Sequence, residues 1–460
     1  MSNDIALWSA TRQAEAIRRR EISSRGLLEH TIMRIERINP KLNAVVTTDF
    51  TAARAAADLA DSALARGDVV GPLHGVPITI KDALETKGIR STGGAIELHN
   101  NVPTRDAPVV RAVKAAGAIV IGKTNLPRWS GDVQTFNEMF GTTVNPWNAE
   151  RVPGGSSGGA GAAVAAGLTS FEIGTDIGGS IRIPAAFNGI FGHKPSWGIV
   201  PSTGYLDHLT GGTTEADINV LGPLARSADD LELLLGILLR KDRPLIADLA
   251  PPPDDVRSLR VAAWIDDSFC PVDGEVLDVV SAATDRLEAS GVSVDRKARP
   301  DIDPDAASNL GLWLVFEAMT QSTPNTSAEG RPANSHRAWL DAHMAREAIR
   351  AQWAQFFTRY DAVLMPVCFV PPFAHLQKGE LSQRKLTCNG RQRMYIDLVR
   401  WTILTGMAYL PSTVPPIGLG KSKLPIGMQV VGPYGGDFRT IRLAAHVAAL
   451  CGGYQAPPMA

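Results

Sequence analysis

The sequence predicts an α/β fold with one large, mixed and mostly parallel β-sheet that is covered by helices on both faces. Two observations support this prediction. Short apolar runs typical of buried strands alternate along the chain with segments whose apolar residues recur at helical spacing. Strands that are buried on both faces contain continuous apolar runs, as seen here. The chain has 460 residues, of which 44% are hydrophobic and 20% charged, and this composition is that of a soluble globular protein.

The individual elements follow in order along the chain. Helical periodicity covers residues 5–65, and one helix is expected to end at Asn39-Pro40 because proline disfavours helical angles in the residue before it. Four elements come next: a strand at 76–82, a helix at 109–116, a strand at 117–122 and a helix at 160–166. The last part is predicted to contain strands at 259–264, 292–294, 362–366 and 424–432, and helices at 275–289, 339–360 and 440–450.

Charge and cysteine content exclude several classes of protein. The chain has 46 basic and 47 acidic residues, so its formal charge of −1 gives no general attraction to nucleic acid or anionic membranes. The four cysteines are far apart in the sequence, which indicates a reducing compartment. The first twenty residues lack the apolar segment of a secretory signal, and no apolar run is long enough to cross a bilayer. We therefore expect a cytoplasmic protein.

One familiar motif occurs in the wrong context. Residues 117–124 match GxxxxGK[ST], but their middle residues form a β-favouring run and no helix follows directly, so a nucleotide-binding loop is not predicted. The nine histidines show no metal-ligand spacing.

Two clusters of glycine and serine, at 154–159 and 178–180, are more unusual, together with Lys81 upstream. On composition alone these clusters are loops where backbones pass closely, and Lys81 is a solvated side chain.

Three segments taken together change that interpretation. Pro77-Ile-Thr-Ile-Lys81-Asp, the PGGSSGG block at 153–159 and GTDIGGSIRIP at 174–184 resemble the amidase signature family. The intervals of 75 residues (156 − 81) and 24 residues (180 − 156) agree with that family's pattern. The resemblance implies the amidase signature fold and a single domain over 1–460, divided into N-terminal helices (1–68), a signature core (71–225), a variable substrate-side region (226–400) and a C-terminal return to the core (401–460).

The resemblance also implies a catalytic set. Ser180 is the expected nucleophile, Ser156 the bridging serine held by a cis peptide after Gly155, and Lys81 the terminal base. A lysine accepts a proton only when it is uncharged, so the pKa of Lys81 is expected to lie well below its usual value of about 10.4, and burial would have that effect. Asp82 is expected to point to the other face of its strand.

The remaining site residues are expected around this set. The oxyanion hole is expected to consist of the N–H groups of Ile177, Gly178, Gly179 and Ser180. Asp176 and Arg182, which flank the loop, are interpreted as supporting residues in a salt bridge or bonded to loop amides. Ser130 and Ser156 are the expected substrate contacts, and the expected neighbours of Ser130 are Trp129, Phe136 and Met139.

The implied reaction is hydrolysis of a carbon–nitrogen bond through an acyl-enzyme. We expect uncharged substrates of the aryl-acylamide, anilide or carbamate (urethane) type, with an esterase side activity, water as co-substrate, no cofactor and no metal. Neither nucleic acid nor membrane is an expected partner, and the chain is expected to be a monomer or homodimer. Two alternatives stay open: the glutaminase component of a tRNA-dependent amidotransferase, from which residues 205–215 depart, and a catalytically silent binding member of the family.

Overall fold

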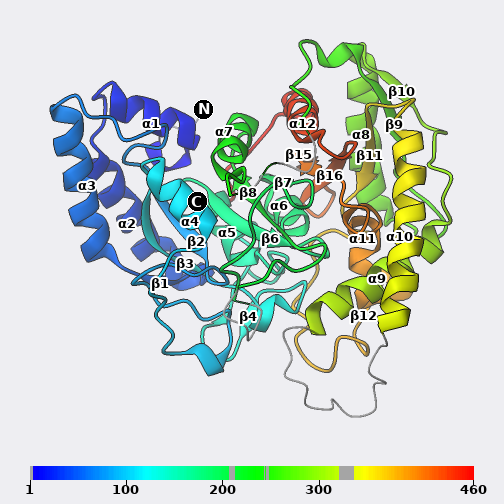
Figure 1. Cartoon of the computed structure of the whole chain (residues 1–460), viewed down its shortest axis with the longest axis horizontal. Helices are drawn as coiled ribbons and strands as arrows, with labels where there is room; N and C mark the ends of the chain where they lie inside the picture. Colours follow the sequence, from blue (N-terminus) through cyan, green and yellow to red (C-terminus); the bar gives the residue numbers. More distant parts are fainter. Residues whose placement is uncertain (1–3, 207–212, 243, 245–247, 321–335) are drawn as a thin grey trace.

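The computed structural model describes residues 4–206, 213–242, 244, 248–320 and 336–460. Its largest sheet has nine strands in the order β10-β9-β11-β16-β14-β7-β8-β6, with β15 paired to β16, and it runs through the middle of the molecule (Figure 1). The strands of this sheet are β6 (Glu172–Asp176), β7 (Phe191–Lys194), β8 (Val220–Ala225), β9 (Arg260–Ala263), β10 (Ser293–Asp295), β11 (Ala362–Pro366), β14 (Ser412–Val414), β15 (Pro416–Leu419) and β16 (Pro425–Val431).

The α/β class and the mixed sheet are confirmed, but the expectation of a mostly parallel sheet is wrong. Strand β9 is parallel to β10 and β11, whereas the other described pairings of the large sheet are antiparallel. Helix α6 (Arg182–Asn188) connects β6 to β7, but the later strand β8 lies between them and is antiparallel to both. The alternation of helix and strand in the sequence therefore predicts the connection from β6 through α6 to β7. It does not predict that β8 is inserted between these two strands.

A smaller sheet carries Lys81. Its order is β1-β3-β2, formed by β1 (Val45–Thr48), β3 (Ile119–Thr124) and β2 (Pro77–Lys81). Strand β2 also lies against β6 of the large sheet, where side chains make hydrogen bonds: the hydroxyl of Thr79 donates to Glu172 Oε1 at 2.9 Å, for example. We call this place the β2–β6 junction; it is made by Thr79, Lys81, Thr169, Glu172 and Thr175.

Helices cover both faces of the large sheet. On one face lie α5 (Gly158–Ala165) and α6, and on the other lie α7 (Ala228–Leu238), α8 (Gly274–Ala289) and α12 (Asp437–Cys451). At the end of β16 the two faces are distinguished clearly, because Gly427 lies against Ala186 of α6 and Gly432 against Thr440 of α12. Three buried tryptophans, Trp264, Trp353 and Trp401, belong to the largest hydrophobic cluster.

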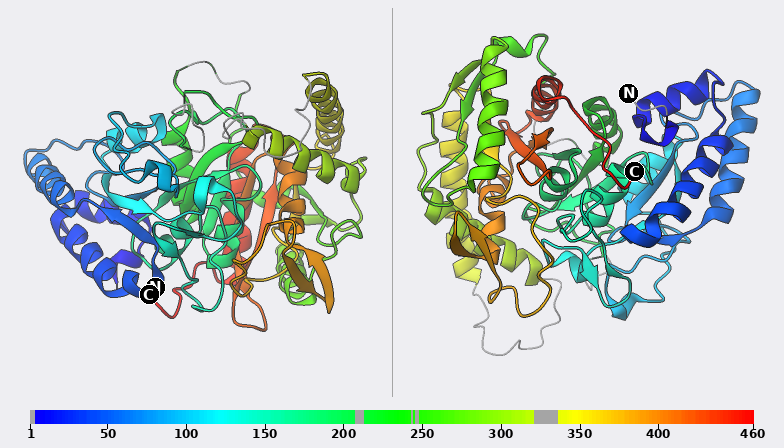
Figure 2. Two further views of the ribbon diagram at one scale, coloured as in Figure 1. Left: turned by 90° about the horizontal axis from the view of Figure 1, so that it is seen from below. Right: turned by 180° about the vertical axis from the view of Figure 1, so that it is seen from behind.

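The two ends of the molecule are helical (Figures 1 and 2). At one end, α1 (Ala10–Arg18), α2 (Ser24–Leu42), α3 (Phe50–Ala65) and α4 (Pro108–Ala115) surround the small sheet. At the opposite end are α9 (Pro304–Thr320), α10 (His336–Phe356) and α11 (Arg400–Gly406). Short elements complete the described chain: β4 (Phe136–Asn137), β5 (Gly141–Thr142), β12 (Lys385–Cys388), β13 (Arg391–Met394) and the 3₁₀ helices at Ile5–Leu7, Ile96–Leu98, Arg128–Ser130, Val256–Ser258 and Tyr395–Val399.

The predicted elements from residue 76 onward are confirmed, with ends that differ by a few residues. The prediction that a helix ends at Asn39-Pro40 is wrong, because α2 continues to Leu42. Pro40 lies in the last turn, so the backbone hydrogen bond that it removes is followed by only two more helical residues. Asn43 then adopts a left-handed conformation (φ 53°) and its N–H donates to Asn39 O at 2.7 Å, while the full burial of Leu42 favours the extra turn.

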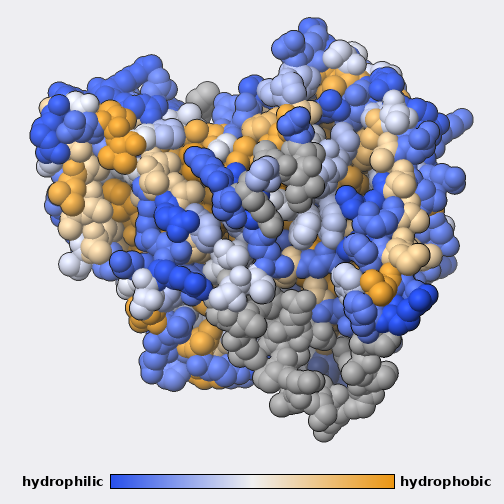
Figure 3. Space-filling view, viewed as in Figure 1, coloured by the Kyte–Doolittle hydropathy of each residue, from blue (hydrophilic) through white to orange (hydrophobic). Residues whose placement is uncertain are grey.

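The surface is mixed in polarity. Hydrophilic side chains predominate on the face shown in Figure 3, and hydrophobic side chains occur in small groups; Leu59 of α3 and Met344 of α10 are among the exposed ones. Within the part of the chain that the structure describes, no helix combines the length and the apolar character needed to cross a bilayer. The four cysteines are free thiols.

Candidate active site

Lys81 is the last residue of β2 and its side chain is completely buried. Its Nζ atom donates to Ser156 Oγ and to Thr175 Oγ1, each at 2.7 Å. Strand β2 is parallel to β3, and Lys81 pairs with Thr124 in the register. The lysine therefore enters the site from a rigid strand at the β2–β6 junction, 75 residues before the serine that it contacts.

Ser156 lies in a tight loop that precedes α5. The Gly155–Ser156 peptide is cis, as the resemblance implies. The next peptide connects the two serine loops, because the N–H of Ser157 donates to Ser180 O at 3.2 Å. A side chain at Gly158 is excluded, since its Cβ would lie 2.2 Å from Thr135 Oγ1. Close packing of small residues thus brings the 153–159 block against the 176–182 loop.

Ser180 lies in the loop between β6 and α6, and the carboxylate of Asp176 shapes this loop. Asp176 accepts from the N–H groups of Gly179 (2.9 Å), Ile181 (3.1 Å) and Arg182 (3.3 Å). Gly179 has φ 128°, a conformation that favours glycine. The loop therefore turns sharply around one buried acid and leaves Ser180 partly exposed.

The expected oxyanion donors are in two different situations. The N–H of Gly179 is engaged by Asp176. No hydrogen bond from the N–H groups of Ile177, Gly178 or Ser180 occurs within the described part of the chain, and all three residues line the same pocket. These three amides are therefore free to meet a ligand atom there.

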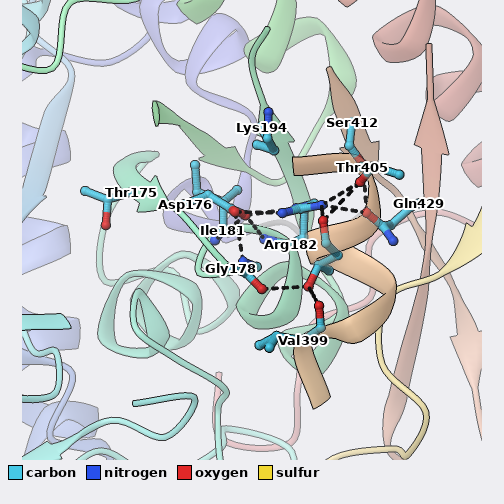
Figure 4. Close-up of polar contacts among 12 residues, drawn as sticks. Thr175, Asp176, Gly178, Ile181, Arg182, Lys194, Val399, Thr405, Ser412 and Gln429 are labelled. Carbon is cyan, nitrogen blue, oxygen red and sulfur yellow. Dashed lines mark hydrogen bonds and ion pairs between the residues drawn. The ribbon is translucent and has the colours of Figure 1, made fainter. Parts of the chain in front are cut away.

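Asp176 and Arg182 form a buried ion pair with two contacts, Nη2–Oδ1 at 2.8 Å and Nε–Oδ2 at 3.0 Å (Figure 4). Burial alone would raise the pKa of Asp176, but the Arg182 guanidinium lowers it below its usual range. Arg182 Nη1 donates further to Thr402 O (2.8 Å), Thr405 Oγ1 (3.1 Å) and Gln429 Oε1 (2.8 Å). The ion pair thus connects the Ser180 loop to α11 and β16.

Other titratable groups are buried around the junction. Burial raises the pKa of Glu172 to about 7 and that of Asp82 to about 6, and it lowers the pKa of Lys123 to about 8. Asp82 accepts from the N–H and the hydroxyl of Thr92. Among the described residues, no group of three or more His, Cys, Asp and Glu side chains is suited to hold a metal ion.

A pocket opens beside Ser180. One side is polar and contains Ser130 and Asp132; both Trp129 and Ser130 have left-handed backbone angles (φ 51° and 57°). The buried Ser130 Oγ makes no hydrogen bond to any residue that the structure describes. Asp132 is ion-paired with Arg384 at 2.6 Å and accepts from the Tyr395 hydroxyl at 2.6 Å. The only acid among the described lining residues is therefore already neutralised.

The opposite side of the pocket is hydrophobic. We call it the apolar wall; its residues are Leu312, Val315, Phe316, Met319, Leu381, Ile396, Val399 and Ile403. Sequence reasoning missed all of them. The signal was present in α9, because Leu312, Val315, Phe316 and Met319 recur at i, i+3, i+4 and i+7, the pattern of one helix face. That pattern alone does not distinguish a pocket from an ordinary core.

Three residues expected near Ser130 do not line the pocket as the described residues define it: Trp129, Phe136 and Met139. Their surroundings give the reason. The Trp129 ring lies close to Gly93, the Phe136 ring faces the Arg384 guanidinium, and the Met139 N–H donates to Asn137.

Comparisons with known proteins show the family of the chain. The family model described as Amidase matches residues 26–331 and 321–441. The chain is 34% identical to an indoleacetamide hydrolase of Bradyrhizobium diazoefficiens (92% of this chain, 83% of that protein). It is 33% identical to a component of the glutamyl-tRNA(Gln) amidotransferase of Carboxydothermus hydrogenoformans (95% of this chain, 96% of that protein).

A solved structure of the same family is also similar to this chain. A bacterial aryl acylamidase of the amidase signature family superposes with a TM-score of 0.83 at 27% identity, over 96% of both chains. The sequence motifs, the site geometry and the extent of these matches agree with one another. The chain therefore belongs to the amidase signature family and is a hydrolase that acts on amides.

Proposed function

We propose that this protein hydrolyses uncharged amides with an aryl or otherwise apolar acyl group, including anilides and aryl carbamates, through an acyl-enzyme. The observation that carries the proposal is the pocket beside Ser180: a hydrophobic wall faces it, and its one carboxylate among the described lining residues is paired with Arg384. A charged amino-acid substrate would require an unpaired charge of opposite sign in such a pocket. An apolar acyl group gains by burial against the wall, by about 25 cal/mol per Å² of apolar area.

The proposed chemistry uses three side chains. Ser180 Oγ attacks the acyl carbon, and its proton passes through Ser156 to an uncharged Lys81. The contact between Lys81 Nζ and Ser156 Oγ, 2.7 Å in a buried site, supports this route. The same proton returns along the route to the departing amine as the carbon–nitrogen bond breaks. Water, activated by the Ser156–Lys81 pair, then releases the carboxylic acid and restores Ser180.

The oxyanion of the tetrahedral intermediate would lie at the free N–H groups of Ile177, Gly178 and Ser180. Donors placed where charge develops lower the barrier, and one such donor contributes about 3 kcal/mol. The unpaired Ser130 hydroxyl lines the same pocket and supports a role in binding the polar part of the substrate.

Two measurements test the proposal. A substrate panel would compare nitroanilides, aliphatic amides, aryl carbamates, aryl esters and glutamine, using the purified chain alone. We expect the apolar anilides and carbamates to give the highest kcat/KM. Turnover of glutamine alone would instead support the glutaminase component of an amidotransferase, the kind of enzyme for which the Carboxydothermus relative is named.

The second measurement addresses the nucleophile. A fluorophosphonate probe should modify one serine, and peptide mass mapping should place the adduct on Ser180. Absence of any adduct, together with absence of turnover across the panel, would support a catalytically silent binding protein.

A further inference from the structure

The peptide between Gly178 and Gly179 is held from both sides. Its carbonyl oxygen accepts from Thr402 Oγ1 at 2.6 Å, and its N–H donates to Asp176 Oδ1 at 2.9 Å. Thr402 approaches so closely that a Cβ at Gly179 would lie 2.8 Å from its hydroxyl oxygen. Because both polar groups of this peptide are bound, its plane cannot rotate without breaking a buried hydrogen bond.

The orientation of this peptide determines what its neighbours can do. The amides of Gly178 and Ser180 lie immediately before and after it, and both are free to meet a ligand atom in the pocket. A displacement of the 178–179 peptide would change the backbone torsions of Gly178 and Gly179, and with them the positions of the N–H groups on either side. Thr402 belongs to α11, more than two hundred residues later in the chain, and is the side chain that binds the carbonyl end.

Thr402 is also part of the turn that forms the pocket. It lies between Val399 and Ile403, which both belong to the apolar wall. The Thr402 hydroxyl contacts the carbonyl oxygens of Gly178 and Val399, two residues that are labelled in Figure 4. The hydroxyl lies 2.9 Å from Val399 O and 2.6 Å from Gly178 O, so its single proton is directed to the nearer oxygen of the Ser180 loop.

We propose that Thr402 is a positioning residue for the oxyanion-binding amides: its hydroxyl fixes the Gly178–Gly179 peptide so that the N–H groups of Gly178 and Ser180 face the reacting carbonyl oxygen. The inference rests on the proposed function, since it assumes that Ser180 is the nucleophile. It assigns to Thr402 no contact with substrate. Its effect should appear in the transition state, where charge develops on that oxygen, and little in substrate binding.

The test compares three variants with the wild type on one anilide substrate. Thr402→Val keeps the volume and removes the hydroxyl, and we expect kcat to fall about 10- to 100-fold with KM changed less than about threefold. Thr402→Ser restores the hydroxyl and should return kcat to within about threefold of wild type. Affinity for a trifluoromethyl ketone, which forms a tetrahedral oxyanion on serine, should fall in parallel with kcat/KM for Thr402→Val.

Thr284→Val is the matched control. Thr284 is a fully buried helical threonine of α8 whose hydroxyl donates to Val280 O at 2.8 Å, and it lies outside the site. Both threonine-to-valine changes should lower the melting temperature, but only Thr402→Val should lower kcat. If Thr402→Val does not fold, Thr402→Ala removes the same hydroxyl and should give the same kinetic result.

Three outcomes would overturn the inference: wild-type kcat in Thr402→Val, a fall in kcat that Thr402→Ser does not restore, or a change confined to KM. Failure of the proposed function is distinguished separately, because it would appear in the wild type as the absence of a fluorophosphonate adduct on Ser180.

Discussion

The β2–β6 junction, which contacts Ser156 through Lys81, and the apolar wall, which lines the pocket beside Ser180, are built in different ways. At the junction, polar side chains are completely buried and make short, directed hydrogen bonds, as Lys81 shows by contacting Ser156 and Thr175 at 2.7 Å. The wall consists of aliphatic and aromatic side chains from α9, Leu381, the Tyr395–Val399 turn and α11, which range from buried, as in Ile403, to exposed, as in Phe316. The interactions at the junction depend on the direction and length of hydrogen bonds, whereas those of the wall depend on the apolar area in contact.

This difference has a consequence for how each region tolerates change. A hydrogen-bonded group in a buried site loses its function when one atom is removed, because the partner is left unsatisfied. An apolar surface loses only the contact area of the side chain that is shortened. Substitutions at the junction should therefore affect all substrates alike, while substitutions in the wall should affect substrates according to their size.

The largest effect is expected for Ser180→Ala. Removing the proposed nucleophile should lower kcat by about 10⁴-fold or more for every substrate in the panel, because covalent catalysis is lost while binding remains. Steady-state kinetics and circular dichroism measure the loss and the retention of the fold. The control is Ser290→Ala, a helix-end serine in contact with Leu287 and His446; it should keep wild-type turnover. Substantial activity in Ser180→Ala would contradict the proposed mechanism.

Lys81→Ala should be the next most damaging change. Without Lys81 as the proposed base, the enzyme should lose about 10³-fold in kcat at neutral pH. Part of the activity should return as the pH rises, since hydroxide in solution can replace the missing base. A pH–rate profile from neutral to alkaline pH checks this, and normal rates at neutral pH would refute the assignment of Lys81.

The sequence predicts Lys81 of the junction, together with Ser156 and Ser180, because all three lie in short motifs at fixed spacing; it does not predict the other junction residues. Lys81, Ser156 and Ser180 were identified on those motifs, and the structure places Lys81 against Ser156 and joins the backbones of the two serine loops. The wall could not be predicted in this way. Its residues are common apolar types spread from 312 to 403, and only tertiary packing of α9 against α11 brings them to Ser180.

The same reasoning explains where the predicted fold differs from the structure. Local periodicity predicted most strands and helices, but the position of β8 between β6 and β7 depends on a non-local pairing that no local pattern contains. The engagement of the Gly179 N–H by Asp176 is likewise a property of the folded loop, and the glycine-rich sequence alone does not indicate which of its amides stay free.

Phe316→Ala tests the wall. The ring lines the pocket and is 39% exposed, so its removal should leave the fold intact. We expect kcat/KM for an arylacyl anilide to fall about 5- to 10-fold, which corresponds to about 1 kcal/mol of lost apolar contact, and kcat/KM for acetamide to stay unchanged. Met344→Ala removes an exposed side chain of α10 that does not line the pocket and should change neither value. Equal losses for both substrates would contradict the distinction between wall and junction.

Glu172 allows the junction to be tested through stability instead of rate. Its carboxylate accepts from the hydroxyls of Thr79 (2.9 Å) and Thr124 (2.7 Å) and from the Ile173 N–H (2.9 Å), and it is completely buried. Burial raises its pKa from the usual value of 4.5 to about 7. Between these two pH values the folded state holds a proton that the unfolded state has lost. The free energy of unfolding should therefore fall as the pH rises through this window, by at most about 1.4 kcal/mol per pH unit from this group.

Glu172→Gln removes that titration, since its amide carries no charge at any pH in the window. Urea unfolding of wild type and variant at several pH values from about 4.5 to about 7.5 gives the comparison. The wild type should lose stability relative to the variant as the pH rises to about 7, and the difference should then level off, because the carboxyl is ionised in both states above that value. Parallel curves would show that Glu172 titrates alike in the folded and unfolded states. Glu172 is not among the residues that line the pocket, so Glu172→Gln should leave the ratio of arylacyl to acetyl substrate turnover unchanged. Phe316→Ala should change that ratio, but it should not change how the free energy of unfolding depends on pH.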